Sequence, residues 1–114
     1  MGECIFCKIA KNEIKAKIVH QDKDVTAFED INPRAPIHIV IIPKKHIERI
    51  SDVTKEDSEL IGKLFFVATK IARDKGIEIS GYRLIINCNK DAGQEVLHLH
   101  LHLMGGRKFT WPPG

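Results

Sequence analysis

The 114 residues are 43% hydrophobic and 29% charged, which predicts one compact domain spanning 1–114 and excludes a disordered chain. Eighteen Lys and Arg against fifteen Asp and Glu give a formal charge of +3, spread along the sequence, so bulk nucleic-acid binding is not indicated. No apolar run approaches the roughly 20 residues of a membrane span, and the amino terminus lacks a signal-peptide pattern. We therefore expect a cytoplasmic protein with no membrane contact.

The first part of the chain predicts a short helix and three strands. The helix is expected at residues 6–11, followed by strands at 16–20 and 25–29 that a polar turn joins into a hairpin. Residues 37–42 are β-branched nearly throughout and are followed by a proline. This segment is therefore expected to form a buried strand.

The second part predicts one long helix and two more strands. Thr54 and Asp57 have the spacing of a capping box at the helix start, and Gly76 supplies the stop. Apolar residues between them recur at helical spacing: Leu60, Ile61, Leu64, Phe65, Ala68, Ile71 and Ala72. Residues 83–87 and 97–103 are expected to be strands on either side of a loop at 89–93.

Together these elements predict the α+β class: a five-stranded antiparallel sheet with one long and one short helix. A parallel sheet would need a crossover between each pair of strands, and only one long helix is present. We expect the helices to lie on one face of the sheet.

Strict alternation marks the last strand, where His98, His100 and His102 point to one side and leucines to the other. The imidazoles recur about every 6.6 Å, so one metal ion with bonds of about 2.1 Å cannot easily take all three. A neutral imidazole can instead attack phosphorus when its far nitrogen is held by an acceptor and its neighbours stabilise the developing charge. The structural alternative is a half-buried strand whose polar face happens to be histidine.

A second cluster is the Cys-x-x-Cys pair of Cys4 and Cys7, whose spacing allows two thiolates to hold one zinc ion. His46 and His98 are candidates for the other two ligands. The alternatives are a redox dithiol or two small buried helix residues. An odd count of three cysteines argues against a disulfide scaffold, and Cys88 is expected in the core.

Residues 98–104 match the His-φ-His-φ-His-φ-φ signature of the histidine-triad superfamily. Further segments resemble its Hint branch nearly from end to end: residues 5–9, 28–31, 42–47, 81–83, 87, 93–94, 105–107 and 111–114. The Gly-Gly-Arg after the triad and the Trp-Pro-Pro-Gly terminus resemble Hint nucleoside phosphoramidases. They do not resemble the Fhit branch of dinucleoside polyphosphate hydrolases.

The resemblance implies that His100 attacks the α-phosphorus of a purine nucleoside phosphoramidate of the adenosine 5'-phosphoramidate type. The resulting nucleotidyl-histidine is then hydrolysed by water, with His102 at the phosphate. The implied nucleotide-binding residues fall into an apolar slot for the purine (Phe6, Ile9, Phe28, Ile31), a ribose acceptor (Asp30) and a phosphate region (Asn87, Gly93, Gln94, His100, His102). Phe6 and Phe28 could instead be core residues.

Glu95 departs from the animal Hint pattern, in which a serine contacts the phosphate and the leaving group. An ionised carboxylate would repel phosphate and could not donate a hydrogen bond, so Glu95 could face solvent, act protonated or assist an amine leaving group. The Cys-x-x-Cys pair resembles prokaryotic relatives, in which two cysteines, a distant histidine and the first triad histidine hold structural zinc. This resemblance implies the set Cys4, Cys7, His46 and His98.

The resemblance also implies a homodimer in which the sheet continues across the interface. The carboxyl terminus of one subunit would approach the partner's site, and Trp111 is the residue expected there, because an aromatic near a chain end needs burial. A Trp111 packed on its own subunit is the alternative. For function, the alternatives to a phosphoramidase are a dinucleoside polyphosphate hydrolase and a non-catalytic purine nucleotide-binding module.

Overall fold

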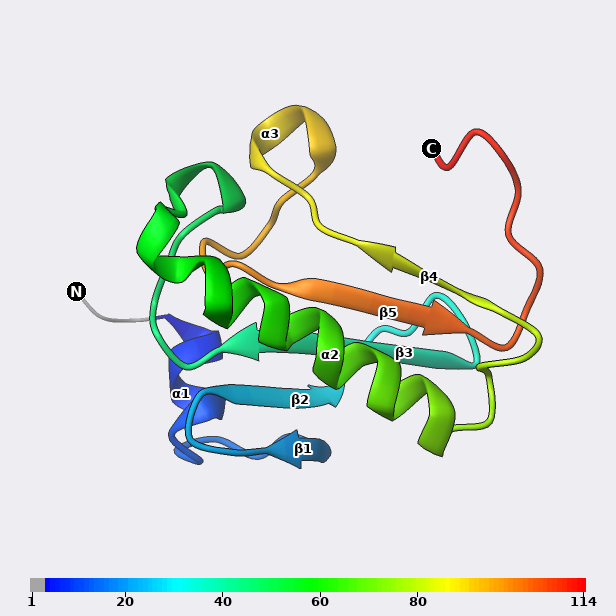
Figure 1. The fold of residues 1–114 in the computed structure, drawn as a ribbon, viewed down its shortest axis with the longest axis horizontal. Coiled ribbons are helices and arrows are strands. Elements are labelled where there is room, and N and C mark those ends of the chain that lie inside the picture. Colours follow the sequence, from blue (N-terminus) through cyan, green and yellow to red (C-terminus); the bar gives the residue numbers. More distant parts are fainter. Residues whose placement is uncertain (1–3) are drawn as a thin grey trace.

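The computed structural model describes residues 4–114 and contains a five-stranded antiparallel sheet in the order β1-β2-β3-β5-β4 (Figure 1). The strands are β1 (Ile18–Gln21), β2 (Val25–Glu29), β3 (Ile37–Pro43), β4 (Tyr82–Ile85) and β5 (Leu101–Gly105). The helices are α1 (Ile5–Ala10), α2 (Ser58–Asp74) and α3 (Asn89–Ala92). The predicted α+β class with an antiparallel sheet is confirmed.

The central strand β3 lies between β2 and β5 and is covered on both faces. Ile39 and Ile41 pack with the buried face of α2. Val40 and Ile42 point the other way and pack with Ile9 of α1. The prediction that the helices share one face is therefore wrong, because a strand that is apolar on both sides needs cover on both sides.

The long helix starts and ends as predicted. Thr54 and Asp57 form a capping box at a 3-10 turn, Lys55–Asp57, that leads directly into α2, and the Thr54 amide donates to the Asp57 carboxylate at 3.0 Å. Gly76 follows the helix with a φ of +76°, a conformation that glycine adopts without strain. Phe65 is 38% exposed, at the edge of the apolar face, which buries Leu64, Val67, Ala68, Ile71 and Ala72.

The last strand, β5, begins at residue 101 rather than at the predicted residue 97. Before it, the chain is held by the end of β3 and by the loop that follows, not by strand pairing. The Leu99 amide donates to the Ile47 carbonyl at 2.6 Å, and His98 Nε2 donates to the Pro43 carbonyl at 2.8 Å. The first two histidines of the segment therefore precede the sheet, and contacts with the end of β3 and its following loop fix them.

Smaller differences concern the ends of elements. Leu99, Leu101 and Leu103 occupy the core as the alternation predicts, whereas Leu97 is 48% exposed. The predicted loop at 89–93 contains helix α3, which ends at Ala92 and is capped by Gly93 with a φ of +82°. β1 and β4 are also displaced by one or two residues from the predicted ranges.

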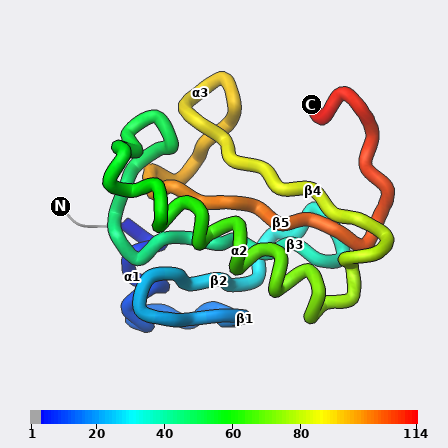
Figure 2. The backbone as a smooth tube through the Cα atoms, viewed as in Figure 1, coloured from blue at the N-terminus to red at the C-terminus, as the bar shows by residue number. Residues whose placement is uncertain are grey.

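The backbone trace shows that three segments distant in the sequence lie close together (Figure 2). Helix α1, the loop after β3 and the segment that enters β5 meet at one end of the sheet, although they are far apart in the sequence. Within residues 4–114, no helix is long and apolar enough to cross a membrane.

Candidate active site and metal centre

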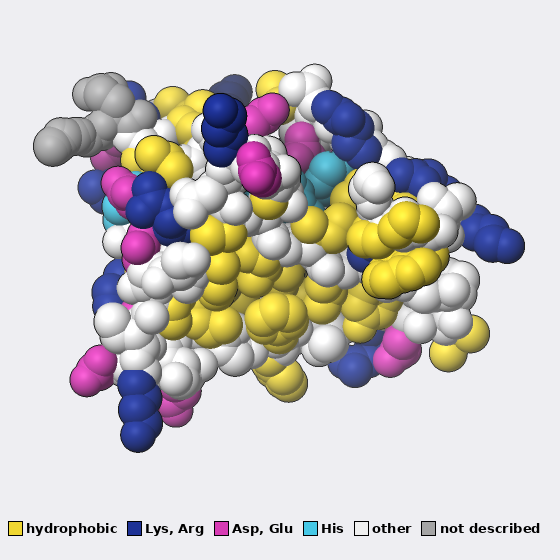
Figure 3. All heavy atoms as spheres, turned by 90° about the horizontal axis from the view of Figure 1, so that it is seen from above, with side chains coloured by type: hydrophobic (Ala, Val, Ile, Leu, Met, Phe, Trp, Pro, Cys, Tyr) yellow, Lys and Arg dark blue, Asp and Glu magenta, His cyan; other side chains and the backbone are white. Residues whose placement is uncertain are grey.

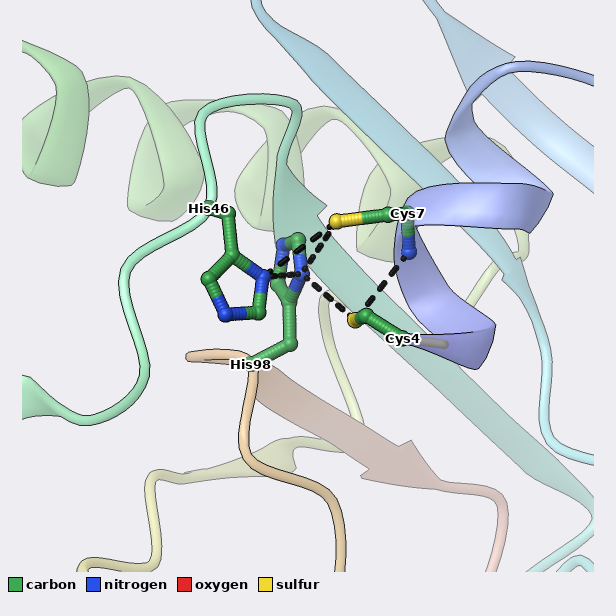
Figure 4. A group of neighbouring side chains, drawn as sticks. All are labelled: Cys4, Cys7, His46 and His98. Carbon is green, nitrogen blue, oxygen red and sulfur yellow. Dashed lines mark hydrogen bonds between the residues drawn. The ribbon is translucent and has the colours of Figure 1, made fainter. Parts of the chain in front are cut away.

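Four side chains predicted to bind metal converge at the amino end of α1 (Figure 4). Cys4 is the N-cap of α1, and its Sγ accepts a hydrogen bond from the Cys7 amide at 3.3 Å. His46 comes from the loop after β3, and His98 from the segment before β5. Their ligand atoms all lie within 4.8 Å of one another, which is close enough to hold a metal ion.

The spacing and chemistry of the four donors fit tetrahedral zinc. Bonds of about 2.0 to 2.3 Å would separate a nitrogen and a sulfur ligand by roughly 3.5 Å and two nitrogens by roughly 3.3 Å. His98 Nδ1 lies 3.3 Å from Cys4 Sγ and 3.5 Å from Cys7 Sγ, and His46 Nδ1 lies 3.2 Å from both Cys7 Sγ and His98 Nδ1. Because His98 Nε2 carries the proton donated to Pro43, its Nδ1 lone pair is left for the metal.

The electrostatic setting also suits a cation. Burial lowers the pKa of His98 to about 4, helped by the neighbouring His46 and His100, so this imidazole is the neutral species that ligates metal. Burial and the adjacent Cys4 raise the pKa of the Cys7 thiol. A bound cation would counteract the burial and the Cys4 contact that raise the pKa of Cys7, because it would stabilise the two thiolates.

His100 has the opposite arrangement of nitrogens. Its ring is buried, and Nδ1 donates to the His98 carbonyl at 2.7 Å. A carbonyl can only accept, so the proton of the neutral ring is on Nδ1 and the lone pair is on Nε2. The ring lies edge-on to Phe6, 5.1 Å between centroids, and 4.9 Å from His102. His100 therefore presents a free nucleophilic nitrogen beside a second imidazole.

The proton of His102 is fixed by a residue that sequence reasoning missed, His38 of β3. The Arg34 amide donates to His38 Nδ1 at 3.0 Å, so the His38 proton is on Nε2, which lies 3.0 Å from His102 Nδ1. His102 Nδ1 must then accept, which leaves its own proton on Nε2. The only signal in the sequence was a polar residue within an apolar strand.

Asp30, His38 and His102 also lie within 4.8 Å of one another, the spacing of a metal site. Asp30 Oδ2 is 3.4 Å from His38 Nε2. Because Nε2 of His38 carries a proton, it has no lone pair for a metal, and the group is better described as a hydrogen-bonded chain. Burial lowers the pKa of His38 and brings the pKa of His102 to about 4, so both rings are neutral near pH 7.

The predicted apolar slot is assembled in part. Phe6, Ile9 and Phe28 belong to one apolar cluster on the α1 face of the sheet, with the two phenyl centroids 5.4 Å apart. Phe6 also touches His100, so this cluster is both core and a wall of the histidine site. Ile31 is 92% exposed, on the loop after β2.

The other residues predicted around the phosphate, and Glu95 beside them, lie along the segment between β4 and β5. Gln94 does not present its side chain as a free donor: its amide nitrogen donates to the carbonyls of Glu48 at 2.7 Å and Val96 at 3.0 Å, and its oxygen accepts from the Asn89 amide at 3.0 Å. Gln94 therefore fastens this loop to the segment after β3. Asn87 is half-buried, and Gly93 and Glu95 are exposed.

Two further predicted residues lie apart from the histidines. Trp111 is 83% exposed in the carboxyl-terminal tail, where the preceding Thr110 carbonyl accepts from Arg83. Cys88 is half-buried, with its Sγ 3.1 Å from Ser51 Oγ, and it belongs to neither apolar cluster of residues 4–114. The expectation that Cys88 is a core residue is therefore wrong.

Comparison with known proteins agrees with this geometry. The HIT domain family model matches residues 11–109. A purine nucleoside phosphoramidase from Escherichia coli K12 is 52% identical over 105 residues, covering 92% of this chain and 88% of the relative. A crystal structure of a HIT family hydrolase from Legionella pneumophila Philadelphia 1 is 54% identical, with a TM-score of 0.97 and coverage of 98% of this chain and 100% of that chain.

A histidine triad protein from Clostridium difficile is 44% identical, with a TM-score of 0.92 over 96% of this chain and 97% of that chain. Cys4, Cys7 and Trp111 lie outside the segment that the family model matches, so the metal centre is supported by its geometry in this chain. The match nevertheless contains the whole histidine segment and the sheet that carries it. The chain belongs to the HIT family and is a hydrolase of the histidine triad type.

Proposed function

We propose that this hydrolase cleaves the P–N bond of purine nucleoside phosphoramidates through a nucleotidyl-His100 intermediate. The observation that carries the proposal is the hydrogen bond from His100 Nδ1 to the His98 carbonyl, which leaves the Nε2 lone pair free. The 52% identity to a purine nucleoside phosphoramidase supports the choice of substrate class.

In the first step, His100 Nε2 attacks the α-phosphorus and the P–N bond breaks. The leaving nitrogen takes the electron pair of that bond and a proton from solvent, and departs as an amine; the proton released from water in the second step replaces it. His102 Nε2–H, oriented by the His38 contact, donates a hydrogen bond to the phosphoryl oxygens or to the leaving nitrogen. The product on the enzyme is a nucleoside monophosphate joined to His100 by a new P–N bond.

In the second step, water attacks the same phosphorus and breaks the bond to His100. One proton of the water is released and the oxygen becomes part of the nucleoside monophosphate. His100 returns to its neutral form, with the Nδ1 proton still donated to the His98 carbonyl. Because that proton stays on Nδ1, Nε2 is the nitrogen available for attack in each cycle.

For substrate recognition, the proposal assigns the purine to the apolar side chains of Phe6, Ile9, Phe28 and Ile31. Asp30 accepts from the ribose hydroxyls, since its carboxylate is partly exposed and a carboxylate suits two neighbouring hydroxyls. The phosphate region would comprise His100 and His102 with Asn87, Gly93, Gln94 and Glu95. Gln94 would contribute through its backbone, because its side chain is engaged in the loop.

We also propose that Cys4, Cys7, His46 and His98 hold a structural zinc ion. Zinc would cross-link α1, the loop after β3 and the segment that leads into β5. The thiolate ligands persist in a reducing compartment, so the proposal includes a cytoplasmic location.

A homodimer is the proposed assembly, formed through the edge strand β4. Seen from above in Figure 3, apolar side chains gather over this edge of the sheet. The edge carries three apolar residues that are only partly buried, Tyr82, Leu84 and Ile86. An edge strand has unpaired backbone N–H and C=O groups that can hydrogen-bond to a strand of another chain. Trp111 of one subunit would then be buried by the partner near its nucleotide site.

The test of the substrate class compares kcat/KM for adenosine 5'-phosphoramidate with that for a diadenosine polyphosphate. The proposal predicts that the phosphoramidate is preferred and that His100→Ala abolishes release of the monophosphate from both. Preference for the polyphosphate would identify the Fhit-type activity. Tight purine mononucleotide binding with no turnover of either substrate would identify a binding module.

A further inference from the structure

We propose that the metal centre and the nucleotide site are thermodynamically coupled, so that metal and nucleotide each strengthen binding of the other. The four metal ligands then act as positioning residues for His100 and Phe6; they are Cys4, Cys7, His46 and His98. The inference rests on the proposed function, because it takes the histidine site as the nucleotide site.

The first connection runs through the backbone of one residue. His98 contributes a ring nitrogen to the metal cluster, while its carbonyl accepts the His100 Nδ1 proton at 2.7 Å. Its Nε2 is fixed on Pro43 at 2.8 Å. A metal at Nδ1 would hold the ring and, with it, the carbonyl that selects the nucleophilic tautomer of His100.

The second connection runs through helix α1, which is only six residues long. Isolated helices of this length are unstable, so α1 depends on its tertiary contacts. Cys4 and Cys7 flank Phe6, whose ring packs on His100 and on Phe28 at centroid distances of 5.1 and 5.4 Å. Metal binding by the two cysteines would therefore fix the aromatic wall that the purine contacts.

The third connection is the loop after β3. His46 lies on this loop, and the next residue, Ile47, accepts the Leu99 amide at 2.6 Å. Leu99 stands between the metal ligand His98 and the nucleophile His100. Three contacts thus join one metal cluster to one nucleophile, and each would be ordered by metal binding.

When one ligand orders these three segments, binding of the second ligand loses less conformational entropy. The result is positive cooperativity without a large conformational change. Linkage requires the effect to be reciprocal: if metal tightens nucleotide binding by a given factor, nucleotide tightens metal binding by the same factor. Coupling between sites typically amounts to about 5- to 150-fold in affinity. A metal that only stabilised the fold would leave the AMP affinity of the folded protein unchanged, and AMP would leave the metal affinity unchanged.

The test uses the full chain and measures zinc affinity by competition with a chromophoric chelator, with and without saturating AMP. We expect AMP to tighten zinc binding at least about fivefold, and zinc to tighten AMP binding by the same factor. Cobalt-loaded protein gives a readout that needs no metal-free state, because AMP should then shift the visible cobalt bands. If AMP binds the loaded protein but leaves both the zinc affinity and the cobalt bands unchanged, the coupling is overturned.

Failure of AMP to bind the metal-loaded protein would instead overturn the proposed function. The matched variants are His46→Ala, which removes a ligand outside the nucleotide site, and His20→Ala, a histidine of β1 paired with Asp22. His46→Ala should lose zinc and weaken AMP binding at least about fivefold, whereas His20→Ala should keep both. A His46→Ala protein that is folded by circular dichroism, lacks zinc and binds AMP as tightly as the loaded wild type would contradict the coupling.

Discussion

His98 and His100 stand two residues apart in one segment, and both donate a hydrogen bond to a backbone carbonyl, but they use opposite ring nitrogens. His98 donates from Nε2 to Pro43 and turns Nδ1 toward the two cysteines. His100 donates from Nδ1 to His98 and keeps Nε2 free. The position of one acceptor therefore decides which ring nitrogen of each imidazole keeps its lone pair.

The third histidine extends the comparison, because its nitrogen is set by a donor rather than an acceptor. His38 Nε2–H donates a hydrogen bond to His102 Nδ1, so the proton of His102 is on Nε2, where it can be donated in turn. Identical side chains thus present a lone pair on Nδ1 in His98, a lone pair on Nε2 in His100 and a hydrogen-bond donor at Nε2 in His102. Changing a neighbour should therefore change the role of a histidine without touching the ring itself.

Loss of the proposed metal ligand Cys7 tests the role proposed for His98 in metal binding and should have the largest effect on stability. We expect Cys7→Ser to abolish stoichiometric zinc binding and to lower the free energy of unfolding by about 3 to 4 kcal/mol at zinc concentrations roughly 100 to 1,000 times Kd. Elemental analysis and urea unfolding measure both. Cys88→Ser, the matched control, should keep the metal, and equal zinc content in the two variants would contradict the assignment.

Replacing His38 tests the donor role of His102. His38→Phe removes the Nε2 proton that fixes the His102 tautomer, so we expect kcat to fall about 10²-fold. We also expect the His102 ring to change from the Nε2–H tautomer to a mixture of tautomers, which its 15N chemical shifts report. If His38 had a purely structural role, these shifts would not change. Unchanged His102 shifts in His38→Phe, or an equal loss of kcat in His20→Phe, would count against the chain of hydrogen bonds.

The pH dependence follows from the burial of His102. Burial lowers its pKa to about 4 from the ordinary 6.5, so between these values the unfolded chain binds more protons than the folded one. The free energy of unfolding should therefore fall as the pH is lowered from about 6.5 to about 4, by at most about 1.4 kcal/mol per pH unit for this group. An NMR titration should place the His102 midpoint near 4; a midpoint above 6 would refute the burial argument.

The smallest effect is expected for Gln94, whose side chain fastens the loop that precedes His98 and His100. Gln94→Ala removes three hydrogen bonds to backbone and should lower the free energy of unfolding by about 1 to 2 kcal/mol. Faster hydrogen exchange at residues 89–96 should accompany it. The control is Lys90→Ala, at an exposed position of α3 in the same loop, which should change neither quantity. Equal destabilisation by the two substitutions would argue against the fastening role of Gln94.

Much of the fold could be predicted because the signals were local. The capping box of Thr54 and Asp57, the stop at Gly76 and the alternation of leucines each depend on a few neighbouring residues. The face that α1 covers was not predictable in this way, because alternation within a strand does not say which helix packs on which side.

The convergence of the four candidate metal ligands could be predicted from spacing and resemblance, and the structure brings their ligand atoms within 4.8 Å of one another. His38 was missed because a single histidine in β3 has no periodic partner in the sequence. Its role depends on a contact with His102, 64 positions away, and on the Arg34 amide. The side-chain contacts of Gln94 likewise depend on the loop after β3, which no local pattern reveals.

Intact-protein mass spectrometry tests the central claim, that His100 is a nucleophile, most directly. Wild type and His100→Ala are mixed with adenosine 5'-phosphoramidate, quenched rapidly without acid and analysed by mass and by peptide mapping. We expect an adenylyl adduct on wild type, located at His100, and none on the variant. An equal adduct on both proteins, or monophosphate release by the variant at the wild-type rate, would contradict it.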